Sequence, residues 1–224
     1  MRSTAFAGMV LCAIAAAASI GCGAGGGASS AVAPNPQPSP TLAPSPTPSP
    51  TPMQLVIGTT VGTDTFPEGD TSTGGHGQQI DGIDCKGALD NQFHHHVHLS
   101  MFVNGEQIAL PRGTGMKQPG HNKFVYHAKC VYYVHTHDET GIIHIEPPDG
   151  RAFTLAQYFD LWGEPLSTNG FAGYSGSVSV YIDGVLQPGM DPTTIAFSPF
   201  EEITLVIGTP PSWIPAYVFP PGYP

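Results

Sequence analysis

Positive charge is scarce in this chain of 224 residues. Lysine and arginine together number 7, against 17 aspartates and glutamates, and the formal net charge is -10. A protein that binds nucleic acid by neutralising phosphates needs a basic surface, so the composition excludes that class. Only 11% of the residues are charged, and no charged residue lies between Arg2 and Asp64. The first quarter of the chain therefore differs in composition from the rest, and we treat it as a separate segment.

Several familiar catalytic and cofactor signatures are absent as well. The sequence has no P-loop and no dinucleotide-binding glycine pattern, and its Gly/Ser stretch at 173–176 lacks the G-x-S-x-G spacing of a nucleophile elbow. None of the 4 cysteines stands in a C-x-x-C pair, which disfavours redox catalysis. Histidine, by contrast, is abundant, with 10 residues against 7 lysines and arginines. The histidines are therefore the feature that a functional hypothesis has to explain.

The N-terminal segment predicts export. Arg2 precedes an apolar run, 5–20, which has the length of a signal-peptide core and is too short to span a membrane. The run ends in Ser19-Ile-Gly-Cys22, which resembles a bacterial lipoprotein signal. The resemblance implies cleavage after residue 21 (a signal peptide at 1–21), lipidation of Cys22 and a membrane-anchored protein in the outer membrane, in the periplasm or on the cell surface. Ser19 stands where such signals usually carry leucine, so ordinary cleavage within 15–19, with Cys22 as a free thiol, is the alternative.

Composition divides the rest of the chain into three parts. Residues 22–54 are rich in Gly and Pro, and such sequences form extended, disordered tethers because they cannot bury apolar surface. Residues 55–210 have the size and pattern of one globular domain. Residues 211–224 form a Pro- and aromatic-rich tail, which either packs along the domain or rests on a neighbouring molecule.

Two cysteines remain for the domain if Cys12 is removed with the signal peptide and Cys22 is lipidated. In an oxidising compartment Cys85 and Cys130 are then expected to form one disulfide.

The domain pattern is mainly β. Short β-rich runs alternate with turn residues, and the pairs 104–105 (Asn-Gly) and 183–184 (Asp-Gly) predict hairpins because they favour positive φ. Two similar runs, 53–59 and 204–210, are candidates to pair with each other or to flank one sheet. We expect a mainly antiparallel β-sandwich or open barrel.

One short α-helix is predicted at about 155–162. Thr154 can cap its start, Gln157 completes a capping box, and Gly163 can end it. Its apolar residues recur at helical spacing, which is typical of core packing.

Seven of the ten histidines fall in two segments. In the first, 93–99, alternate residues of a strand share a face. His94, His96 and His98 would therefore lie on one face, with Val97 and Leu99 on the other.

The second segment, 134–146, contains the turn-forming residues 138–141. If these form a hairpin loop, His135 pairs with His144, and His137 and Glu146 share their face. A slip of one residue in this register would move His144 to the opposite face.

Neutral imidazoles beside a carboxylate suit Zn²⁺, Cu²⁺, Ni²⁺ or Fe²⁺. We expect the two segments to form a metal site, with copper or zinc as the favoured ion. The alternative is a half-exposed sheet face on which imidazoles bond to one another and to tyrosine hydroxyls. His76, His121 and His127 show no such pattern. The predicted metal ligands are His94, His96, His98, His135, His137, His144 and Glu146.

Three motifs between about residues 82 and 209 resemble an uncharacterised family of exported bacterial and archaeal domains. They are His96-Val-His-Leu followed by Phe-Val-Asn-Gly105, then Cys130-x4-His-Thr-His-Asp-x-Thr-Gly-Ile-Ile-His-Ile-Glu146, then Phe153-Thr-Leu-x-Gln-Tyr-Phe-Asp-x-Trp162. The resemblance implies export and common descent, but no activity.

The functional expectation is a lipid-anchored, extracytoplasmic domain that captures, buffers or delivers copper or zinc. It would contact the membrane through its lipid and exchange metal with a donor or acceptor protein, and its oligomeric state is open. The alternatives are a metalloenzyme, with Glu146 or Asp138 as general base on a bound water, and a metal-free envelope interaction module. No catalytic residue and no organic cofactor are predicted.

Overall fold

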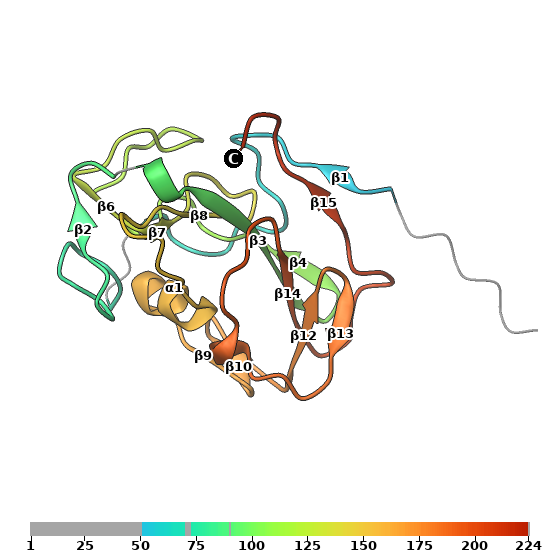
Figure 1. The fold of residues 1–224 in the computed structure, drawn as a ribbon. Helices are drawn as coiled ribbons and strands as arrows, with labels where there is room; N and C mark the ends of the chain where they lie inside the picture. The colour runs from blue at the N-terminus through green and yellow to red at the C-terminus, as the bar shows by residue number, and fades with distance from the viewer. Residues whose placement is uncertain (1–50, 70–72, 90, 224) are drawn as a thin grey trace, which may run out of the picture. The chain divides into compact units, whose positions relative to one another are not determined.

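A computed structural model of the chain describes residues 51–69, 73–89 and 91–223, and these belong to one compact unit (Figure 1). The predicted signal peptide, Cys22 and most of the predicted tether lie outside the described residues. Within the described ranges no helix has the length and apolar character needed to cross a membrane.

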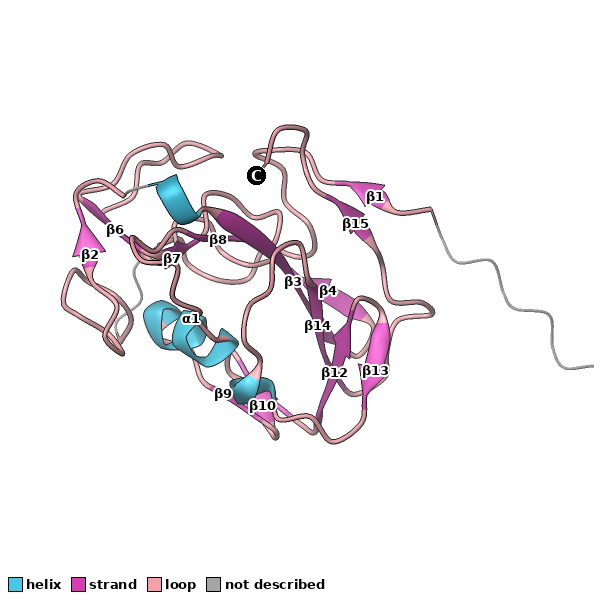
Figure 2. Cartoon of the chain, in the orientation of Figure 1, coloured by secondary structure: helices cyan, strands magenta, loops and turns pink. Residues whose placement is uncertain are grey.

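The architecture is mainly β, as the sequence predicts (Figure 2). The largest sheet has the order β13-β12-β14-β3-β8-β7, and β4 pairs with β3 beside β8. Its pairs are antiparallel except for β3 and β14, which run parallel. The strands are β3 (His95–Val103), β4 (Glu106–Ile108), β7 (Val134–His135), β8 (Ile142–Ile145), β12 (Val178–Ile182), β13 (Val185–Gln187) and β14 (Glu202–Ile207).

Three smaller sheets surround this one. β1 (Met53–Gln54) pairs with β15 (Tyr217–Val218); β5 (Met116–Lys117) and β2 (Cys85–Lys86) flank β6 (Cys130–Tyr132); and β10 (Gly170–Phe171) lies between β9 (Leu166–Ser167) and β11 (Tyr174–Ser175). The Cys85–Cys130 disulfide is confirmed and joins the neighbouring strands β2 and β6.

The expectation for the run 53–59 was wrong. Only Met53–Gln54 is a strand, and it pairs with β15 of the tail rather than with 204–210. The chain turns soon afterwards, at Gly58, whose positive φ of 77° breaks an extended run.

The predicted helix is confirmed as α1 (Leu155–Trp162). The Gln157 N–H donates to the Thr154 hydroxyl, and the Thr154 N–H donates to the Gln157 side chain, which completes the capping box. Gly163 ends the helix in the left-handed conformation. Two short 3-10 helices complete the elements, η1 (Asn91–Phe93) and η2 (Pro192–Thr194).

Strand β3 divides the domain into two sides. Its residues Val97, Leu99 and Met101 are buried in the main core, together with Tyr158 and Trp162 of α1. By strand alternation, His96 and His98 point to the opposite side. This is the side on which the site lies.

The tail covers that side, which answers the question that the sequence leaves open. The ring of Tyr217 lies 4.1 Å from that of His98, and the ring of Tyr223 lies 4.5 Å from that of His96 (centroid distances). The tail is thus part of the domain and contributes to the surroundings of the histidines.

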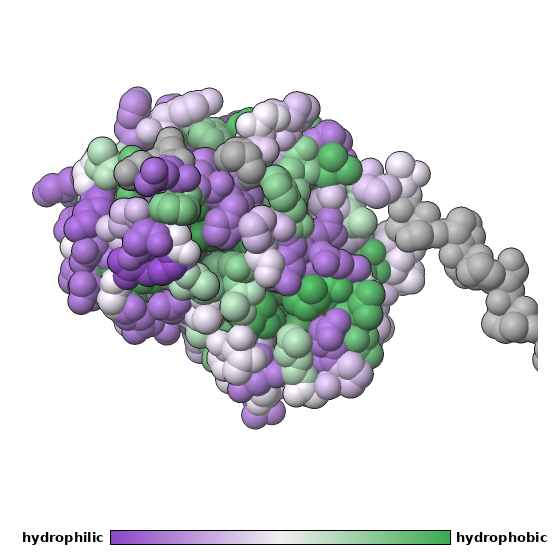
Figure 3. Space-filling view, in the orientation of Figure 1, coloured by the Kyte–Doolittle hydropathy of each residue, from purple (hydrophilic) through white to green (hydrophobic). Residues whose placement is uncertain are grey.

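The hairpin of β12 and β13 lies away from the histidines and carries no candidate ligand. Val185 and Leu186 are exposed there, and Figure 3 shows apolar surface where these strands lie.

Candidate metal centre

A row of three histidines crosses three adjacent strands. β7 and β8 pair with His135 opposite His144, as predicted, and the Glu146 N–H donates to the Tyr133 carbonyl. On its other edge β8 pairs with β3, so that His144 also stands opposite His96. His144 therefore lies between the two histidine segments and brings them to one place.

The loop between β7 and β8 is longer than predicted and runs over 136–141. Asp138 holds it together: one carboxylate oxygen accepts from the Thr140 N–H and hydroxyl, and the other accepts from the Gly58 N–H at 2.7 Å. Because one oxygen bonds within the loop and the other bonds to Gly58, Asp138 has a structural role, and it lies outside the ligand groups.

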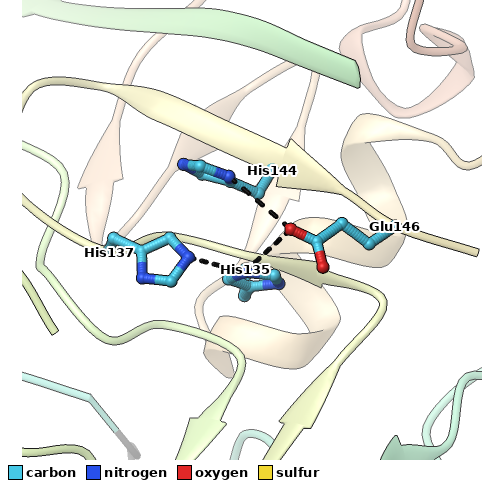
Figure 4. A group of neighbouring side chains, drawn as sticks. All are labelled: His135, His137, His144 and Glu146. Carbon is cyan, nitrogen blue, oxygen red and sulfur yellow. Dashed lines mark hydrogen bonds and ion pairs between the residues drawn. The ribbon is translucent and has the colours of Figure 1, made fainter. Parts of the chain in front are cut away.

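Side chains that could hold a metal ion gather in two groups. One is His135, His137, His144 and Glu146; the other is His94, His96 and His144. In each group the candidate ligand atoms all lie within 4.8 Å of one another. Figure 4 shows the first group, with three imidazoles and the carboxylate pointing toward one another. Six of the seven predicted ligands thus come together.

Backbone carbonyls fix the tautomers of two rings. Nδ1 of His135 lies 3.0 Å from the Tyr132 carbonyl oxygen, and Nδ1 of His137 lies 2.5 Å from that of Val125. A carbonyl only accepts, so each Nδ1 carries the hydrogen and each neutral ring has its lone pair on Nε2. Metal-binding histidines are commonly held in this way by their second nitrogen.

The two Nε2 atoms of His135 and His137 face each other at 3.1 Å. Both are acceptors in the neutral state, so no hydrogen bond joins them and their lone pairs repel. Two nitrogens that ligate one tetrahedral Zn²⁺ at about 2.0–2.1 Å are themselves about 3.3 Å apart. The observed separation is therefore close to that of two ligands on one ion.

In the second group, two ring nitrogens converge on a third. Nε2 of His94 and Nε2 of His96 lie 3.2 Å and 3.1 Å from the same atom, Nδ1 of His144. A ring nitrogen carries either one hydrogen or one lone pair, so it forms a good hydrogen bond with only one of them. An ion placed among the three nitrogens accepts all three lone pairs.

The Glu146 carboxylate lies between the groups. Its Oε1 is 3.1 Å from His94 Nε2, 3.8 Å from His144 Nδ1 and 4.0 Å from His135 Nε2. It is the only carboxylate of the two groups, and in its ionised form it places a negative charge beside the position of a bound cation.

Burial disfavours protonation of these imidazoles, so a proton does not supply the positive charge. Desolvation, followed by the nearby imidazoles, holds the pKa of His135 and of His144 well below the usual range. Desolvation also lowers the pKa of His94 and His137 and raises the pKa of Glu146 to about 7. Near neutral pH these imidazoles are therefore unprotonated and available to a metal ion.

His98 is the predicted ligand that the groups leave out. Its Nε2 lies 2.9 Å from the Thr140 carbonyl oxygen, so Nε2 donates, and the Tyr217 ring packs against it. Burial lowers its pKa to about 4. These contacts make His98 a neutral, hydrogen-bonded core residue.

Each group lines a cavity of about 280 Å³. His135, His137 and Glu146 line one together with Met116 and His127. His94, His96 and His144 line the other, and the exposed Tyr126 borders both. Most of the candidate ligands are therefore buried, yet small molecules can reach them through the two cavities.

Aromatic residues around the centre were not predicted from sequence. Phe124 stacks on His137 with ring centroids 4.6 Å apart, and Tyr223 packs on His96. The aromatic content of the tail was the available signal, but nothing in it indicated which face the tail covers.

No protein-family model, no curated protein and no solved structure matches the chain. The interpretation of the centre therefore depends on its own geometry: buried histidine clusters that could hold a metal ion.

Proposed function

We propose that the protein is a lipid-anchored, extracytoplasmic metal-binding domain that captures, buffers or delivers copper or zinc. The observation that supports it most strongly is the 3.1 Å approach of the His135 and His137 Nε2 atoms while both Nδ1 atoms donate to carbonyls. A bound cation would relieve that contact, and burial disfavours a proton in this role.

The donor set favours copper or zinc over the alkaline-earth ions. Five imidazoles and one carboxylate are present, and the cysteines of the described domain are joined in a disulfide. Imidazole suits Zn²⁺ and Cu²⁺, whereas Ca²⁺ and Mg²⁺ prefer oxygen ligands.

The proposed location depends on the sequence of the N-terminal region. Its apolar run before Cys22 and the Pro-rich segment behind it resemble those of a tethered lipoprotein. A disulfide in the domain is compatible with an oxidising compartment. Attachment near a membrane suits a protein that receives metal from, or passes it to, another envelope protein.

Metal analysis tests the proposal. The full chain, purified in detergent with a Strep tag and no chelating column, is dialysed against copper or zinc and measured by mass spectrometry. We expect at least about one ion per chain and a higher melting temperature, since an ion at 100 times its Kd adds about 2.7 kcal/mol of stability. Less than about 0.2 ion per chain with no thermal shift would contradict the proposal and favour the metal-free interaction module.

A matched pair of variants separates specific from surface binding. The double variant His135→Asn/His137→Asn removes the paired Nε2 atoms, whereas His121→Asn changes an exposed histidine outside both groups. The first should lose metal and the second should retain it.

The two cavities favour a second candidate, a metalloenzyme. Histidines of both groups line cavities that small molecules can enter, as an open coordination position requires. Glu146 would then be the base, since Asp138 is engaged in its loop. Azide added to the Cu²⁺-loaded protein tests for an open position: a new charge-transfer band shows the open position that this candidate requires, and an unchanged spectrum excludes the candidate.

A further inference from the structure

The centre contains more donors than one ion uses. Zn²⁺ in proteins takes four ligands, whereas six candidate ligand side chains meet here. We define the strand-side set as His94 Nε2, His96 Nε2 and His144 Nδ1, and the loop-side set as His135 Nε2, His137 Nε2 and Glu146 Oε1.

We propose that the centre binds two metal ions side by side, one in the strand-side set and one in the loop-side set. This rests on the proposed function and specifies how the same residues bind metal.

One ion cannot satisfy both sets. Two nitrogens that ligate one ion at about 2.0–2.1 Å are at most about 4.2 Å apart. Among the described residues, ligand atoms within 4.8 Å of one another fall into two groups, and neither contains both the His135–His137 pair and the His94–His96 pair. An ion in one set therefore leaves the other pair unliganded.

Each set brings its nitrogens to a spacing close to that of ligands on one ion. In the loop-side set, the lone pairs of His135 and His137 face each other at 3.1 Å. In the strand-side set, Nε2 of His94 and Nε2 of His96 lie 3.2 Å and 3.1 Å from Nδ1 of His144. The two sets have no nitrogen in common, so each can hold an ion of its own.

Glu146 is placed to reduce the repulsion between two ions. Its Oε1 lies 3.1 Å from His94 Nε2 in one set and 4.0 Å from His135 Nε2 in the other. A carboxylate has two oxygens and can therefore contact both ions. Carboxylate ligands shared in this way occur where two metals lie about 3.5–4 Å apart.

Each set also has its own approach from solvent. The strand-side histidines line the cavity beside Phe124 and Tyr223, and the loop-side residues line the cavity beside Met116 and His127. Three protein ligands and an adjoining cavity leave each ion a position for water or an exchanging ligand.

Stoichiometry tests the inference. The full chain is saturated with Zn²⁺ in detergent and weighed by native mass spectrometry, beside His94→Asn/His96→Asn, His135→Asn/His137→Asn and the control His121→Asn. We expect two ions in the wild type and the control, and one ion in each paired variant. One ion in the wild type would overturn the inference while leaving the proposed function intact; no ion would overturn both.

A measurement on the wild type alone covers the case in which a paired variant fails to fold. Cu²⁺ is added stepwise and the electron paramagnetic resonance spectrum is recorded. Two neighbouring Cu²⁺ ions should broaden or weaken the signal between the first and second equivalents. An isolated-copper signal that saturates at one equivalent would overturn the inference.

Discussion

His98 and His135 are equally buried, each about 1% exposed, yet their surroundings differ in the way that matters for metal binding. The Nε2 of His98 donates to a carbonyl, and Tyr217 packs on its ring. The Nε2 of His135 faces a second acceptor, because Nδ1 of its ring already donates. Burial alone therefore does not identify a ligand; a lone pair directed at another lone pair does.

The histidine side accordingly has two parts. In the sealed part, around His98, Thr140 and Tyr217, the His98 ring already has its hydrogen-bond and packing partners. The open part, the strand-side and loop-side sets, contains the lone-pair contact between His135 and His137, which a cation would relieve. The sealed part should control stability, and the open part should control metal affinity.

The largest effect should come from acid, acting on the metal-free protein. Burial lowers the pKa of His98 to about 4, from 6.5. Between these values the unfolded chain binds a proton that the native state excludes, so stability falls as the pH falls through this window. His98 alone contributes up to about 3 kcal/mol, and His135 and His144 act in the same direction.

Urea unfolding at pH 7.5, 6, 5 and 4 measures this loss. Glu146 opposes it, because a pKa raised to about 7 lets the native state bind a proton before the unfolded chain does. In Glu146→Gln the loss should therefore be steeper. Stability that is constant or higher at pH 5 would contradict the description of the histidines as buried and neutral.

The next effect concerns the open part. His135→Asn/His137→Asn should weaken binding of the loop-side ion at least about 100-fold, or about 2.7 kcal/mol. The stability of the metal-free protein should change by less than about 1 kcal/mol, since the lost hydrogen bonds are offset by relief of the lone-pair contact. Competition with a chelator measures the affinity. A stability loss larger than the affinity loss would reverse the assignment of the two parts.

The converse result is expected for His98→Asn. Loss of the bond to Thr140 and of packing under Tyr217 should lower stability by about 2 kcal/mol. The number of bound ions should stay the same, as native mass spectrometry can show. Loss of an ion in this variant would show that His98 is a ligand after all.

The smallest effect should be that of Tyr223→Ala. Its ring packs on His96 at the edge of the strand-side cavity, and losing such a contact costs about 1 kcal/mol or less. Removal of the ring should speed metal release to a chelator in stopped-flow measurements, while His135 and His137 keep their ion. An unchanged release rate would show that the tail does not control access.

Local signals in the sequence predicted much of this structure. The capping box of Thr154 and Gln157 predicted α1, because its groups are three residues apart. The turn-forming residues near Gly141 predicted the register that places His135 opposite His144, and the count of cysteines predicted the disulfide. Strand alternation and the hairpin register predicted six of the seven candidate ligands, although only His96, His135 and His144 lie within strands and the other three lie just beyond strand ends.

The remainder depends on contacts between distant residues. Alternation placed His98 with His96, but its exclusion follows from Thr140 and from Tyr217 of the tail, more than 100 residues away. The carbonyls of Tyr132 and Val125, which fix the ring tautomers, are backbone groups, so no residue type in the sequence indicates them.

The most direct test of the central claim is anomalous diffraction from crystals of the protein grown with zinc and measured at the zinc edge. We expect a peak about 2.0–2.1 Å from Nε2 of both His135 and His137. A zinc-saturated crystal with no peak between these two rings would contradict the assignment of this centre as a metal site.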